Sequence, residues 1–154
     1  MMAPAALEGT CLCGNVSYTS TCLPSSFSLC HCRSCRRNTG SAFGAWADLP
    51  KSSVKINSSH AQLLQKSSLA VRSSCSQCGT PLFMEYHATG DTISVAAGTI
   101  DEGRVVGKLA GPSSHIFVAE KAAWFTIPDD GLRRYDRFPD DFQEAIDAWK
   151  AGRT

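Results

Sequence analysis

Seven of the eight cysteines in this sequence fall into three tight clusters. They form an N-terminal pair (Cys11, Cys13), a three-cysteine loop (Cys30, Cys32, Cys35) and a C-x-x-C knuckle (Cys75, Cys78). The opening stretch MMAPAALEGTCLCG has no basic start and no apolar segment, so we expect no signal peptide and a reducing, cytoplasmic compartment. In that compartment disulfides are rare and clustered cysteines more often hold metal, which predicts zinc sites.

The knuckle and the N-terminal pair have the features of two halves of one zinc site. A C-x-x-C turn presents two sulfurs on one side of a tight loop, and Gly79 lets the chain bend away after it. The N-terminal pair is likewise followed by a glycine, Gly14. Zinc takes four ligands in a tetrahedron, so neither pair completes a site alone. Together the two pairs predict a structural zinc site with no open position.

The three-cysteine loop predicts a different kind of site. Three sulfurs within six residues can bind one zinc from a single loop, and the fourth position is then open or taken by His31, Cys22 or water. Three protein ligands with an exchangeable fourth position are typical of a catalytic zinc. In the alternative pairing, Cys32 and Cys35 join the knuckle as an ordinary four-cysteine finger, which leaves Cys30 and the N-terminal pair without a site.

The elements that must position these clusters are predicted to be mostly β-strands. Residues 15–20 alternate apolar and polar side chains, and short segments with turn residues between them predict further strands over 42–49, 54–56, 69–72, 82–86 and 92–97. Two further strands, 115–119 and 122–127, are predicted to pair through a turn at Glu120 and Lys121. A chain of 154 residues predicts a single, mainly β domain over residues 1–154, built as a sheet stack or sandwich.

One helix is predicted, at residues 139–151. Acidic residues at its start suit the positive end of the helix dipole. Phe142, Ile146 and Trp149 lie at positions i, i+4 and i+7 and form one apolar face, and Gly152 ends the helix. We expect this face to dock on a sheet edge.

The cysteine-bearing strings, and two strings that follow them, resemble those of a known enzyme family. In chain order they are GTCLCGNVSY, CHCRSCRRNTGSAFGAW, CSQCGTPLF, AAGTID and HIFVAEKAAW. Over about residues 8–126 the sequence resembles the glutathione-dependent formaldehyde-activating enzyme family, which includes centromere protein V and belongs to the Mss4-like zinc folds. The resemblance implies a mainly β fold, a stack of small antiparallel sheets around zinc.

The resemblance also implies a ligand set and an activity. It places a structural zinc on the N-terminal pair and the knuckle, and a second, labile zinc on the three-cysteine loop. In the reaction that names the family, glutathione and formaldehyde condense to S-hydroxymethylglutathione, which is a carbon–sulfur lyase reaction in reverse. We therefore expect a zinc-dependent lyase with two zinc ions per chain and glutathione as its candidate co-substrate.

Five further residues near these motifs are candidates for the site. Arg36 and Arg37 follow the three-cysteine loop, where a guanidinium could pair with a substrate carboxylate or offset the charge of the thiolates. Phe43 and Trp46 could form the wall of a substrate pocket beside the zinc, or pack in the core. His115 could face the second zinc as a proton carrier, or be a buried core histidine.

Charge and composition exclude several classes of function. Fifteen basic and fourteen acidic residues give a net charge of +1, whereas a protein that binds nucleic acid through its net charge needs a basic surplus. No apolar run approaches the length that crosses a bilayer. We expect a small-molecule substrate and neither a nucleic-acid nor a membrane partner, and no motif indicates an oligomer.

Two other functions fit the same cysteines. The zinc scaffold could act on a carbonyl-bearing metabolite without glutathione, by lyase, isomerase or condensation chemistry. Alternatively, both zinc ions are structural and the β surface is a binding module for a protein. Zinc content before and after mild chelation separates the enzymes from the binding module, because only the enzymes require one tight and one labile zinc.

Overall fold

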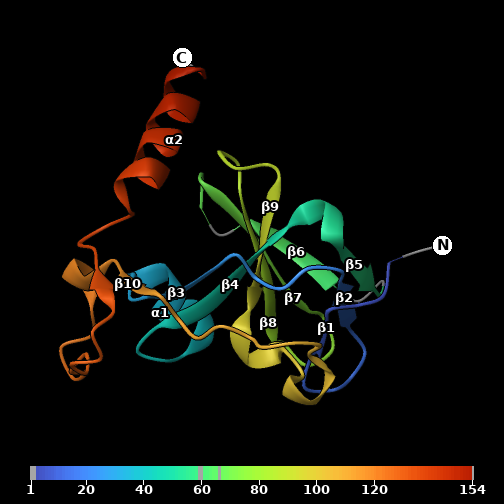
Figure 1. Cartoon of the computed structure of the whole chain (residues 1–154). Helices are drawn as coiled ribbons and strands as arrows, with labels where there is room; N and C mark the ends of the chain where they lie inside the picture. Colours follow the sequence, from blue (N-terminus) through green and yellow to red (C-terminus); the bar gives the residue numbers. More distant parts are fainter. Residues whose placement is uncertain (1–2, 59–60, 66, 154) are drawn as a thin grey trace.

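The computed structural model describes residues 3–58, 61–65 and 67–153, and two β-sheets make up most of this part of the chain (Figure 1). The smaller sheet contains three strands in the order β1 (Leu7–Thr10), β2 (Ser17–Ser20) and β5 (Val54–Asn57). The larger sheet contains eight, in the order β11 (Arg133–Arg134), β10 (Ser114–Ile116), β3 (Ser26–Cys30), β4 (Gly44–Pro50), β9 (Thr92–Ala96), β8 (Pro81–Tyr86), β7 (Ala70–Cys75) and β6 (Ala61–Gln65).

Most neighbouring strands in both sheets pair antiparallel, which confirms the predicted mainly β fold. The six strands predicted between residues 15 and 97 correspond to β2, β4, β5, β7, β8 and β9. One edge of the larger sheet differs, because β10 runs parallel to both β3 and β11. This edge brings residues near 115 and 133 alongside the end of β3, where the three-cysteine loop begins.

The predicted hairpin of strands 115–119 and 122–127 is wrong. Only residues 114–116 of the first segment form a strand, and it pairs with β3 and β11 rather than with residues 122–127. The chain leaves the sheet at Phe117, whose φ of 56° is in the left-handed region, and continues as a 3-10 turn over Val118–Glu120. Residues 122–127 form no strand. Just after the 3-10 turn, the Lys121 Nζ donates to the Phe125 carbonyl at 2.9 Å.

The main core lies where the smaller sheet packs on the larger one. Its largest fully buried members include Leu7, Tyr18, Leu49 and Phe83, and the Tyr18 and Phe83 rings meet edge-on with centroids 5.3 Å apart. Gly9 lies directly under the Tyr18 ring, so close that a Cβ there would overlap the ring. A second cluster of buried residues surrounds the three-cysteine loop on the larger sheet.

Two α-helices and four 3-10 turns complete the described part of the chain. The helices are α1 (Arg33–Thr39) and α2 (Asp140–Ala151), and the other 3-10 turns cover Lys51–Ser53, Ala97–Thr99 and Glu102–Arg104. The predicted C-terminal helix is confirmed: it docks through Phe142 on Tyr86 at the end of β8, with ring centroids 5.0 Å apart, and buries Ile146 (Figure 1). Among the described residues no helix is long and apolar enough to cross a membrane.

Candidate functional site

The N-terminal pair and the knuckle meet in space and form a four-cysteine site. Their four Sγ atoms lie within 4.8 Å of one another; Cys13 Sγ is 3.6 Å from Cys11 Sγ and 3.8 Å from Cys75 Sγ. A tetrahedral zinc with Zn–S bonds of about 2.3 Å requires sulfurs about 3.8 Å apart. The four sulfurs therefore fit a tetrahedral metal ion.

The backbone around the four-cysteine site is shaped for thiolates. The Val16 N–H donates to Cys11 Sγ at 3.3 Å, and the Gln77 N–H donates to Cys75 Sγ at 3.4 Å. Gly14 and Gly79 turn the chain with φ of 80° and 76°, a conformation that other residues adopt at a cost. Hydrogen bonding from Thr80 lowers the pKa of Cys78, which favours the metal-binding thiolate.

The three-cysteine loop forms a second site at the junction of β3 and α1. Cys30 is the last residue of β3, and Cys32 is the N-cap of α1, where its Sγ accepts from the Cys35 N–H at 3.3 Å. The three Sγ atoms lie within 4.8 Å of one another. Cys30 and Cys35 are buried and Cys32 is partly exposed, and Cys22 is exposed and belongs to neither site. The structure thus has the four-plus-three grouping, not the pairing of Cys32 and Cys35 with the knuckle.

A buried arginine compensates the charge of the three-cysteine site. Arg72 of β7 is only 5% exposed, and its Nη2 donates to Cys35 Sγ at 3.8 Å. Its Nε and Nη1 are buried and have no hydrogen-bond partner among the described residues. A buried guanidinium is costly unless negative charge lies close to it, so this position of Arg72 favours ionised thiols. Ionised thiols are the form that binds metal.

Hydrogen bonds among the three thiols distribute their protons unequally. Those from Cys30 and Cys32, followed by the charge of Arg72, lower the pKa of Cys35. The same hydrogen bonds raise the pKa of Cys30. The buried indole N–H of Trp46 also contributes to the lowered pKa of Cys35. Gly44 lacks a side chain, which leaves space for Trp46 and Cys35 to approach each other.

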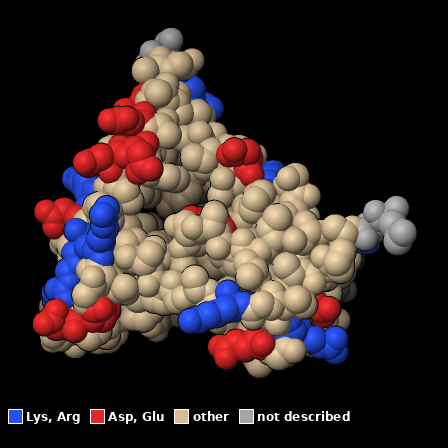
Figure 2. Space-filling view, viewed as in Figure 1, with Lys and Arg blue, Asp and Glu red and all other residues tan. Residues whose placement is uncertain are grey.

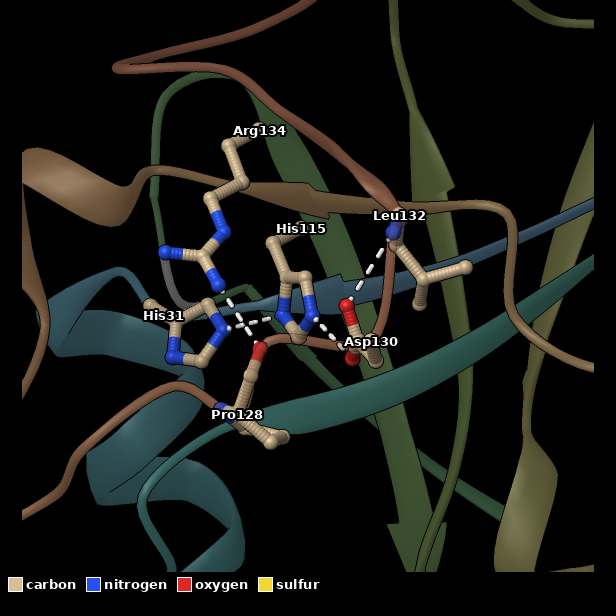
Figure 3. A network of polar contacts seen from close by, with 6 residues as sticks. All are labelled: His31, His115, Pro128, Asp130, Leu132 and Arg134. Atoms are coloured by element: carbon tan, nitrogen blue, oxygen red, sulfur yellow. Dashed lines mark hydrogen bonds and ion pairs between the residues drawn. The ribbon is translucent and has the colours of Figure 1, made fainter.

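A chain of polar contacts begins at His31 of the three-cysteine loop and continues through His115 to Asp130 (Figure 3). His31 Nε2 is 2.9 Å from His115 Nδ1, and His115 Nε2 is 2.9 Å from a carboxylate oxygen of Asp130. The carboxylate can only accept, so His115 donates through Nε2 and, when neutral, accepts through Nδ1 from His31. Burial lowers the pKa of His31 to about 4, and its Nδ1 is buried without a hydrogen-bond partner in the described chain.

This network holds the loop but lies on the other side of β3 from Cys30. His115 is opposite Leu29 in the β3–β10 register, and side chains alternate between the faces of a strand. His115, predicted to face the second zinc, therefore reaches the three-cysteine site only through His31. Phe43 packs its ring against His31 with centroids 5.5 Å apart. It therefore lies beside the His31–His115–Asp130 network and is not among the residues that line the cavity described next.

A cavity of about 310 Å³ opens on the face of the larger sheet that carries Cys30. Its floor includes Cys30, Trp46, Asp48 and Ser94, and its wall beneath α2 includes Phe138 and Phe142. The surface is visibly hollowed below α2, with acidic atoms showing inside the hollow (Figure 2). One thiol of the three-cysteine site therefore borders a space of ligand size.

The other predicted site residues have mixed positions. Trp46 lines the cavity, as predicted for a pocket wall, and it is also 99% buried, as predicted for a core residue. Arg36 is partly buried and Arg37 is exposed, both on α1, and neither lines the cavity. The charge of Arg36 contributes to the lowered pKa of His31.

Sequence analysis missed the residues that join the cysteines to the cavity. The sequence did contain a signal for Arg72. This charged residue lies two positions after Ala70 and two before Ser74, so it shares their face of the strand, where buried side chains are expected. Asp48 follows Trp46 in β4 at the same spacing. Asp130 lies in a loop and had no signal in the sequence.

Comparisons with known proteins place this fold and site in one family. A sequence model described as "Glutathione-dependent formaldehyde-activating enzyme" matches residues 6–120, a range that contains both cysteine sites. A Schizosaccharomyces pombe protein named as an uncharacterized lyase is 35% identical over 79 residues, which are 51% of this chain and 57% of that protein. The chain therefore matches little more than half the length of this relative.

A solved structure shows the same fold. The crystal structure of a Rhodobacter sphaeroides protein aligns with a TM-score of 0.53 at 18% sequence identity, and covers 83% of this chain and 98% of that one. At this identity the likeness concerns the fold alone. On the extent of the family match, which holds both cysteine sites within residues 6–120, the chain belongs to the glutathione-dependent formaldehyde-activating enzyme family.

Proposed function

We propose that this protein is a zinc-dependent lyase that makes or breaks a bond between a thiol sulfur and a carbonyl carbon at the three-cysteine site. The observation that carries the proposal is that Cys30 belongs to a three-thiol cluster and also borders the cavity. The family and the lyase name of the relative support the reaction class. The reaction adds RSH to an aldehyde: the S–C bond forms, the C=O π bond breaks, and the thiol proton ends on the oxygen.

The residues of the site would divide this task. Cys30, Cys32 and Cys35 would hold zinc, which when bound supplies Lewis-acid stabilisation of negative charge on sulfur or oxygen. Arg72 donates to Cys35, helps to lower the pKa of that thiol, and would balance the negative charge of the metal-bound thiolates. Tyr86 lines the cavity, within electrostatic reach of Cys30 and Cys35, and supplies an O–H donor for the substrate oxygen.

The remaining residues exclude water and fix the loop. Phe138 and Phe142 cover the cavity from the side of α2, so the reacting groups are shielded from bulk water. The His31–His115–Asp130 network fixes the backbone between Cys30 and Cys32, together with the hydrogen bond from the His31 N–H to the Ile116 carbonyl at 2.9 Å. In this proposal the four-cysteine site holds a second zinc with a structural role.

Metal content and thiol binding test the proposal together. Protein loaded with zinc should hold two ions per chain, and mild chelation should remove one of them. In cobalt-substituted protein, a small thiol such as 2-mercaptoethanol should change the thiolate-to-cobalt charge-transfer bands. Cys32→Ser should remove this response, and Cys22→Ser, an exposed cysteine outside both sites, should keep it.

The rival functions predict different results. A binding module with two structural metals retains both ions under chelation and gives no thiol response. An enzyme that acts on a carbonyl compound without a thiol also loses one ion to mild chelation. Its cobalt bands do not respond to a thiol but do respond to an aldehyde alone. Either pattern contradicts the proposed carbon–sulfur chemistry.

A further inference from the structure

A row of three polar side chains that ends at a methionine crosses the floor of the cavity away from the cysteines. In the strand registers Ser26 lies opposite Asp48, Asp48 opposite Ser94, and Ser94 opposite Met84. Directly opposed residues point to the same face of a sheet. All four line the cavity, so the row forms one continuous strip at the cavity floor.

The charges around the cavity have one sign. Asp48 on the floor and Asp141 at α2 are acidic, and no lysine or arginine is among the described residues that line the cavity. Arg72 lies beside Cys35 and is not part of the lining. Several hydroxyl groups line the cavity, and Trp46, Tyr86, Phe138 and Phe142 supply its aromatic surface. The lining suits an apolar body that bears hydrogen-bond donors and lacks negative charge.

Asp48 lacks a compensating cation. Its Oδ1 accepts from Ser94 Oγ at 2.5 Å, and it takes part in none of the ion pairs among the described residues. Burial raises the pKa of Asp48 although hydrogen bonds from Ser94 and Ser26 act to lower it, which is consistent with a carboxylate that has hydroxyl partners but no cation. A ligand that brings an ammonium or hydroxyl group to this carboxylate would relieve the cost of that burial.

We propose that Asp48 is a specificity-determining residue: the substrate is an uncharged or cationic molecule with an apolar, ring-bearing body, whose N–H or O–H donor binds the Asp48 carboxylate while its reactive end lies at Cys30. This inference rests on the proposed function for the reactive end only. Glutathione, whose two carboxylates outnumber its one ammonium group, fits this lining less well than a neutral or cationic thiol, because the described lining offers the carboxylates no basic partner.

Three benzene derivatives whose polar groups are cationic, neutral and anionic test the cavity without any reaction. Benzylamine, benzyl alcohol and benzoate are titrated into ¹⁵N-labelled, zinc-loaded protein, and amide shifts of β4 and β9 report the site. Benzylamine should bind about tenfold tighter than benzoate, since a charge-assisted hydrogen bond replaces a repulsion. Asp48→Asn should weaken benzylamine about fivefold to tenfold and leave benzyl alcohol within about twofold. Asp91→Asn, an exposed aspartate outside the cavity, should change neither.

The outcomes separate this inference from the proposed function. Benzoate binding as tightly as benzylamine in the parent protein, or an unchanged ratio in Asp48→Asn, overturns the inference. The parent protein alone gives the first result, so it does not depend on the variant folding. Cobalt-substituted protein titrated with cysteamine and 3-mercaptopropionate tests the metal separately. If the benzyl probes follow the expected order and neither thiol perturbs the cobalt bands, the carbon–sulfur proposal fails while the role of Asp48 in ligand choice stands.

Discussion

Replacing one cysteine in each site should reveal very different contributions to stability. Cys13 and Cys32 suit the comparison, because Cys13 is exposed and its loss leaves no cavity, and serine is a favoured N-cap that can replace Cys32 at the start of α1. Cys13→Ser breaks a link between residues 62 positions apart. Cys32→Ser disturbs a loop whose outer ligands, Cys30 and Cys35, are five positions apart.

The difference follows from what the unfolded chain can bind. A six-residue loop can hold metal without the fold, and binding to the unfolded state reduces the stabilisation that a ligand provides. The four-cysteine site requires a loop about twelve times longer, and closing it costs about 2 kcal/mol more conformational free energy in the unfolded chain. Cys13→Ser should therefore lower the free energy of unfolding by about 2 kcal/mol more than Cys32→Ser does.

Urea denaturation of the two variants and the parent, each with zinc present, measures this difference. Cys22→Ser serves as the control and should stay within about 0.5 kcal/mol of the parent, since Cys22 is exposed and outside both sites. Adding a chelator should reduce the gap between the parent and Cys13→Ser. Equal losses in Cys13→Ser and Cys32→Ser would refute the loop-closure reasoning and make the three-cysteine site as structural as the other.

Three further substitutions test other parts of the structure. Arg72→Met should weaken metal binding at the three-cysteine site about 10–100-fold, measured by competition with a chromogenic chelator, because the thiolates lose their buried counter-charge. Gly9→Ala should lower the free energy of unfolding by about 1–3 kcal/mol in urea, since its Cβ overlaps the Tyr18 ring; an unchanged midpoint would contradict this packing. Asp48→Asn should be more stable than the parent at neutral pH, and the gain should vanish in acid. The raised pKa means that the folded state keeps the Asp48 proton to higher pH than the unfolded chain, so ionisation costs stability as pH rises through that pKa. Thermal melts across pH check the trend, and a gain that grows toward acid would refute it.

Local spacing carried much of what could be predicted. The close spacing within each cluster marks the cysteines as ligands, and the need of zinc for four ligands joins the N-terminal pair to the knuckle. The predicted strands from β2 to β9 are short apolar or alternating segments bounded by turn residues, and α2 shows apolar residues at i, i+4 and i+7. In each case the signal lies within about ten consecutive residues, which is the scale at which periodicity is informative.

Elements that depend on distant partners were missed or wrongly predicted. The segment 122–127 has strand-like composition but no neighbouring strand, since β10 pairs with β3 and β11 instead. In β3, Phe27 and Leu29 alternate with serines. The role of this strand as the support of the three-cysteine loop depends on its pairing with the distant strand β10, which no local pattern reveals. α1 has seven residues and is capped by a cysteine sulfur, a start signal that helix rules do not include.

The polar part of the cavity could not be predicted because it is a property of strand register. Ser26, Asp48, Ser94 and Met84 come from four strands and are unremarkable in their own segments. A shift of one residue in any pairing would turn that strand's side chain to the other face and break the strip. Single-segment patterns carry no information about such alignment.

The docking of α2 over the cavity has a consequence for how this scaffold can diversify. All seven clustered cysteines lie within the family-matched residues 6–120, whereas Phe138, Asp141 and Phe142 of the cavity wall come from the segment after it. The metal ligands and one wall of the cavity are therefore encoded in separate stretches of the chain. Exchanging the segment from Phe138 onward would remodel that wall and keep both the thiol clusters and Asp130, which supports the three-cysteine loop, so new selectivities can arise by replacing this segment without rebuilding the reactive centre.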